Sequence, residues 1–148
     1  MGASDWLYFN TITDDPEVML AELHRQAFAS GEYHWAQEEV TRPDNLAGLH
    51  ELYGQEENEA LATNGTHSIL DIFRVLPAGS PDEFGAVMPL SEEELLGVFP
   101  EGPPSREEFE AAHDAGRLDL APRWSGRFTV IMLDGKPHET AVWGFSGD

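Results

Sequence analysis

The chain has 148 residues, the size of one domain with a real core, and its 28 acidic and 8 basic side chains give a formal charge of -20. A field of this sign repels nucleic-acid phosphates and anionic lipid headgroups, so we expect the protein to bind neither nucleic acid nor membrane. The absence of cysteine excludes disulfides, thiolate metal sites and cysteine nucleophiles. No basic leader or long apolar run is present, which predicts a cytoplasmic protein without a membrane span.

The first third of the sequence predicts a strand followed by helices. Residues 6–12 are rich in aromatic side chains and end at a Thr-Asp-Asp-Pro turn signal. Asp15 is a favourable N-cap before a proline, and Gly31 is a typical stop signal, so we expect a helix to about residue 30. A shorter helix is expected over 44–53, followed by a polar surface loop.

Residues 68–76 form the most strand-like run of the chain, and Gly65 and Pro77 bound it. Its apolar side chains alternate to both sides, which predicts a central strand covered on both faces. Two polar residues interrupt the run, Asp71 on one face and Arg74 on the other. An ionised carboxylate between apolar neighbours is costly unless it is paired, so Asp71 either ties down a neighbouring loop or serves a site.

The second half predicts a short strand over 84–88, two helices and a hairpin. Segments 91–99 and 105–116 each open with a serine three residues before a glutamate, which is the spacing of a capping box. Near the end of the second segment, Arg117 is explained by the attraction of cations to the last carbonyls of a helix. Asp134-Gly135 between two apolar runs predicts a β-hairpin, although the Lys-Pro pair that follows indicates a longer or bulged loop.

Together these elements predict a single α+β domain over residues 1–148. Its mostly antiparallel four- or five-stranded sheet is expected to pack against one layer of about four helices. The oligomeric state is left open.

His67 and Asp71 are the candidate catalytic residues. With Ser68 they resemble a triad by composition, but adjacent strand residues point to opposite faces. On a straight strand, at about 3.3 Å per residue, roughly 13 Å would separate His67 from Asp71. They can form one local triad, or hold one metal ion, only if the chain bends at Gly65.

The candidate binding residues are Tyr33, His34, Trp35 and Arg74. Aromatic side chains with polar tips are common both in pocket walls and in ordinary loop anchors, so both interpretations stay open. No histidines have the spacing of a known metal-ligand set, and no glycine-rich phosphate loop is present. We therefore predict neither a metal nor a cofactor.

Three functions are compatible with these observations. The charge without a catalytic motif favours an acidic protein-interaction or inhibitory module, of the immunity or antitoxin type, that meets a basic partner. The alternative is a small-molecule-binding protein or small enzyme with an acid–base pocket around His67 and Asp71. The third is an acidic domain from a salt-adapted or arginine-rich proteome, since Lys136 is the single lysine. Carboxylates gathered on one face would support the first function, and an even spread would remove its basis.

Overall fold

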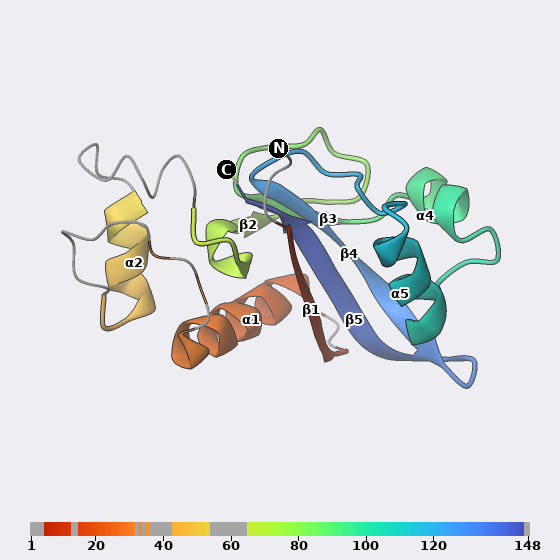
Figure 1. The fold of residues 1–148 in the computed structure, drawn as a ribbon, viewed down its shortest axis with the longest axis horizontal. Coiled ribbons are helices and arrows are strands. Elements are labelled where there is room, and N and C mark those ends of the chain that lie inside the picture. Colours follow the sequence, from red (N-terminus) through yellow and green to blue (C-terminus); the bar gives the residue numbers. More distant parts are fainter. Residues whose placement is uncertain are drawn as a thin grey trace.

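The computed structural model describes residues 5–12, 15–31, 33, 35, 43–53 and 65–146. These residues form a five-stranded sheet of order β1-β5-β4-β3-β2 (Figure 1). Its strands are β1 (Asp5–Thr11), β2 (Arg74–Val75), β3 (Ala86–Pro89), β4 (Ser125–Leu133) and β5 (Lys136–Phe145). β1, β5 and β4 pair antiparallel, whereas β4, β3 and β2 pair parallel. The sheet is therefore mixed, and the expectation of a mostly antiparallel sheet is wrong.

Four short α-helices accompany the sheet within the described residues. They are α1 (Pro16–Ser30), α2 (Leu46–Tyr53), α4 (Glu92–Val98) and α5 (Arg106–Asp114), and a 3-10 turn, η1, spans Ile69–Asp71. The expected helix number and the α+β class are thus confirmed, and the described elements form a single compact domain.

The helices cover both faces of the sheet (Figure 1). Neighbouring residues of a strand point to opposite faces, and here they divide between two hydrophobic cores. Trp6 and Val142 belong to the core shared with α1, α2 and η1, whereas Leu7 and Trp143 belong to the core shared with α4 and α5. The one helical layer expected from the sequence is therefore two layers.

The parallel pairing of β3 with β4 follows from the connection between them. α4 and α5 fill this connection, and such a crossover can return the chain to the same end of the sheet, which a tight turn cannot do. Both helices begin at the predicted capping boxes. Ser91 and Ser105 each accept the backbone N–H of a glutamate three residues on, and that glutamate accepts the serine N–H in return.

β4 and β5 form the predicted hairpin. Asp134 and Gly135 have φ of 52° and 76°, the pattern of a type I′ turn, so the connection is the two-residue type and not a longer loop. The irregularity lies further back, as a bulge between Ile131 and Met132. There the Met132 N–H donates to the Pro104 carbonyl at 2.8 Å, which anchors the start of α5 to the sheet.

Trp6 of β1 packs directly onto the backbone of β5 and β4, the next two strands of the sheet. Gly126 of β4 and Gly144 of β5 are register partners, and a Cβ built on either residue would collide with the Trp6 ring and with backbone atoms of the adjoining strand. These two glycines therefore provide the flat surface on which the buried indole lies.

Residues 68–76 do not form the predicted central strand. Ile69–Asp71 is the 3-10 turn η1, and only Arg74–Val75 joins the sheet, as the edge strand β2. The apolar side chains of η1 are buried because the turn packs against α1. The prediction is wrong because a continuous apolar run indicates burial without fixing the backbone conformation.

α1 has the predicted bounds, with Asp15 as N-cap and Gly31 at its end, and it carries an exposed ion pair. Glu22 and Arg25 approach to 2.6 Å, and hydrogen bonds from Arg25 and Gln26 lower the pKa of Glu22 from 4.5 to about 2. Because the folded-state pKa is depressed, the pair contributes its stability in full above pH 4.5 and loses it as the pH falls towards 2.

We predict that Arg25→Ala returns the pKa of Glu22 most of the way towards 4.5, because the strongest hydrogen-bond donor to its carboxylate is then missing. Titration of the side-chain carboxyl carbon by NMR measures this shift directly. Arg123→Ala is the matched control and should leave the Glu22 titration unchanged. A Glu22 pKa that stays near 2 in Arg25→Ala would contradict this assignment.

Candidate functional site

The loop before η1 closes tightly on Asp71. Thr66 donates to Asp71 Oδ1 twice, from its backbone N–H at 2.7 Å and from its hydroxyl at 2.8 Å. Because that hydroxyl proton is used, the 2.7 Å contact between Thr66 Oγ1 and Ser68 Oγ is donated by the serine. Gly65 permits this closure, since its φ is 72° and any Cβ there would collide with the Asp71 carboxylate.

Asp71 therefore holds its own loop together. It is fully buried. Thr66 contacts it from five residues away, so the chain bends between them, and the distance between His67 and Asp71 estimated for a straight strand does not apply. His67 stands in the middle of the bend with φ of 54° and is half-buried. Neither residue lines the cavities that the described residues form at α4–α5, at β1–α1 or at α1–β2. This geometry supports the structural alternative for Asp71.

His24 of α1 fixes the other side of this turn. Its Nε2 lies 3.1 Å from the Ile69 carbonyl and 2.7 Å from the Ile72 carbonyl, so it donates to both ends of η1. The Ile69 N–H in turn donates to the hydroxyl of Tyr8 at 3.3 Å. The sequence pattern assigns His24 only to the margin of the α1 core, and nothing local to it indicates the turn that it binds.

The candidate binding residues lie in separate places. Tyr33 stacks on Phe28 of α1 and meets Trp35 edge-on, and both pack partly buried against the core beneath α1. Arg74, at the edge of the sheet, donates to the Phe84 carbonyl at 2.8 Å and pairs with Glu83. His34 lies outside the described residues.

A buried arginine ties α4 to the sheet. Arg127 of β4 is 4% exposed and binds Asp82 through two hydrogen bonds, of 2.6 and 3.1 Å, and Glu94 of α4 at 3.3 Å. Burial disfavours the charged guanidinium, but the hydrogen bonds to Asp82 and Glu94 outweigh it and raise the pKa of Arg127. No local sequence pattern predicts this site, because its three members are far apart along the chain.

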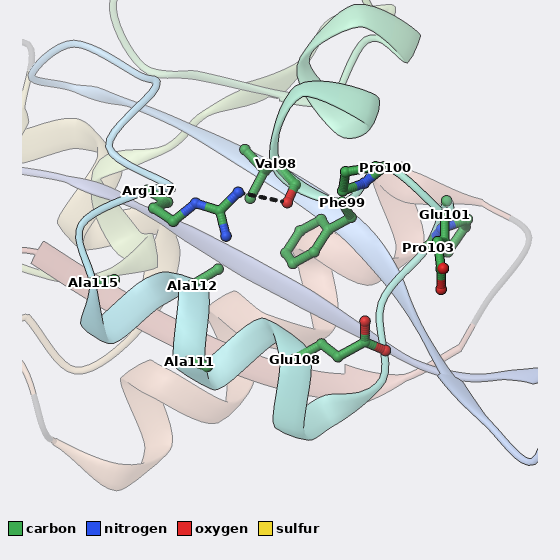
Figure 2. A pocket seen from close by; sticks show the side chains of 11 residues that line it. Val98, Phe99, Pro100, Glu101, Pro103, Glu108, Ala111, Ala112, Ala115 and Arg117 are labelled. Carbon is green, nitrogen blue, oxygen red and sulfur yellow. Dashed lines mark hydrogen bonds between the residues drawn. The ribbon is translucent and has the colours of Figure 1, made fainter.

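A cavity of about 700 Å³ lies between α4 and α5. Its floor is apolar and includes Phe99 and Ala112, while Glu101 and Glu108 lie at one end and Arg117 at the other (Figure 2). The Arg117 side chain donates to the Val98 carbonyl, the last residue of α4, at 2.9 Å.

The segment that surrounds this cavity carries many of the acidic side chains that the structure describes. Residues 92–119 contain nine carboxylates against two arginines, and eight of these carboxylates are exposed. The helices of the opposite layer, α1 and α2, carry three carboxylates and one arginine between them. The helices α4 and α5 themselves carry seven carboxylates and one arginine, so within the described residues the α4–α5 layer is the more acidic of the two.

The sequence contained the parts of this cavity but not their arrangement. Acid clusters and two capping boxes mark 92–94 and 105–110, and the prolines between them predict separate helices. Arg117 was expected to neutralise its own helix end, and its backbone N–H does bond Ala112 of α5. Its side chain, however, reaches the end of α4, which depends on how the two helices pack.

Among the described residues, no group of three or more metal-ligating side chains gathers in one place. Within the same part of the chain, no helix has the length and apolar character needed to cross a bilayer. Comparison with known protein families, with characterised proteins and with solved structures gives no match.

Proposed function

We propose that the protein binds a basic partner protein through the face formed by α4 and α5. The observation that carries this proposal is the cavity between the two helices, which has an apolar floor and two carboxylates at its edge. It lies on the layer where eight exposed acidic residues gather. Protein interfaces combine an apolar anchor site with charged surroundings that steer the partner into register, and this face offers both.

The charge alone would attract any cationic protein at low salt, because a net charge of -20 acts over the whole surface. The cavity adds a site at which the partner can bind in one preferred orientation. An inhibitory module of the immunity or antitoxin type would use such a face to cover a basic surface of its partner, and this remains the activity that we propose.

The test compares two triple variants that remove the same charge from opposite layers. The first variant neutralises the α4–α5 face and combines Glu93→Gln, Glu107→Gln and Asp114→Asn. The second neutralises the α1–α2 layer and combines Glu17→Gln, Asp44→Asn and Glu51→Gln. The probe is an acetylated and amidated peptide of alternating leucine and arginine, titrated by calorimetry at several salt concentrations.

We expect the first variant to weaken binding roughly tenfold and to flatten its salt dependence, because it removes charges beside the binding face. At physiological salt the second variant should change binding less than about twofold, since its charges lie on the opposite layer and are screened. Equal weakening in both variants would show that only the overall field attracts the peptide, and the proposal would fail.

An acid–base pocket around His67 and Asp71 receives no comparable support. Asp71 is buried and bonded to Thr66 of its own loop, and His67 lines none of the three cavities described above.

A further inference from the structure

The α4–α5 cavity has opposite charges at its two ends. Glu108 lies near the start of α5, and Arg117 follows its end, with Ala115 between them on the cavity wall. At 1.5 Å per residue, the seven residues from Glu108 to Ala115 cover about 10 Å along the helix axis. Figure 2 shows the Phe99 ring between the arginine and the two glutamates.

The cation at this cavity is fixed in place and keeps most of its hydrogen-bonding capacity. Arg117 follows Gly116, whose φ of 74° ends α5, and its side chain is held by the Val98 carbonyl. The ion pairs recorded among the described residues use other arginines. Because a guanidinium has five N–H donors, Arg117 can bind a carboxylate while it keeps its bond to Val98.

The two glutamates at the other end are equally available to a cation. Glu108 accepts the Ser105 N–H through one oxygen, which leaves its second oxygen for a ligand. The same recorded ion pairs do not include Glu101 or Glu108. A carboxylate matches the planar donor fork of an arginine better than the compact ammonium of a lysine.

We propose that this cavity binds the C-terminal arginine residue of the partner protein. Its terminal carboxylate pairs with Arg117, its methylene stem lies over Phe99, and its guanidinium binds Glu101 and Glu108. Glu108 and Arg117 lie at opposite ends of α5, so each charged end of an extended arginine residue meets a group of opposite sign. The stem is apolar, as the floor of the cavity requires. This inference rests on the proposed function, since it specifies which group of a basic partner enters the face.

The experiment uses the tetrapeptide Gly-Ala-Leu-Arg, acetylated at its N-terminus, as the free acid and as the C-terminal amide. Both are titrated into the intact protein, into Arg117→Met and into the double variant Glu101→Gln with Glu108→Gln. Glutamine at position 108 still fits a capping box, so the helix start is kept. Glu51→Gln, in α2 on the opposite layer and outside the cavity lining, is the control.

For the intact protein, we expect amidation to weaken binding at least tenfold. In Arg117→Met the acid and the amide should bind equally, because the partner of the carboxylate is missing; this loss of difference is the signature of a direct pair. The double glutamate variant should weaken both peptides at least tenfold, and Glu51→Gln should change either by less than about twofold.

The outcomes separate this inference from the function on which it rests. If the alternating leucine and arginine peptide binds the α4–α5 face but the amidated tetrapeptide binds as tightly as the acid, terminal capture is wrong and the basic-partner function stands. If neutralising the α4–α5 face does not weaken the alternating peptide selectively, the function itself fails. An acid–amide difference that persists unchanged in Arg117→Met would also overturn the inference, because another group would then bind the carboxylate.

Discussion

Replacing Arg127 with alanine should lower the free energy of unfolding by about 3–5 kcal/mol, as expected when one partner of a buried ion pair is removed. The guanidinium is 4% exposed and binds Asp82 and Glu94 from two other parts of the chain. Without it, the carboxylates of Asp82 and Glu94, which are 30% and 26% exposed, lose their shared cation. Urea unfolding at neutral pH measures the loss.

Two further variants separate the charge from the volume of this side chain. Arg127→Met keeps much of the stem but should still show most of the loss in unfolding free energy expected for Arg127→Ala, because Asp82 and Glu94 remain without their cation. Arg123→Ala removes an exposed arginine just before β4 and should change stability by less than about 0.5 kcal/mol. If Arg127→Met proved as stable as the natural protein, the ion pairs would not be what ties α4 to β4.

The elements that were predictable from the sequence are those set by neighbours along the chain. The capping boxes at Ser91 and Ser105 and the Asp134-Gly135 turn each satisfy backbone groups within four residues, so the local pattern contains the whole reason for the structure. The parallel pairing of β3 and β4 is different, because it depends on the path of the intervening helices. The signal for a parallel pair was the order of the elements along the chain, in which two helices separate the two strands.

The segment around Asp71 shows why the candidate site was less predictable. Its apolar residues signalled burial correctly, but the same composition suits a strand or a turn packed under a helix. The turn is selected by partners that are distant in sequence, His24 of α1 and Tyr8 of β1. Likewise Glu101 and Arg117 are ordinary surface residues in the sequence, and only the packing of α4 on α5 places them on one cavity.

Asp71→Ala should destabilise the fold by about 3 kcal/mol, because it leaves the N–H and hydroxyl of Thr66 buried without their acceptor. Asp71→Asn keeps an acceptor oxygen but loses the charge, and about 1–2 kcal/mol of loss is expected from the weaker hydrogen bonds. Asp119→Asn, on the exposed surface, is the control and should change stability by less than about 0.5 kcal/mol.

The sign of the Asp71→Asn effect decides between the two roles of this carboxylate. A buried acid kept for catalysis is a burden on the fold, so its neutralisation leaves stability unchanged or raises it. A carboxylate that closes its own loop stabilises the fold, and its neutralisation lowers the unfolding free energy. Thermal unfolding resolves the difference, since 1 kcal/mol corresponds to a Tm shift of roughly 2–4 °C or more for a domain of this size. We expect the Tm to fall, because both hydrogen-bond donors of Thr66 bind Asp71, and because the Asp71 carboxylate packs so closely on Gly65 that a Cβ there would collide with it.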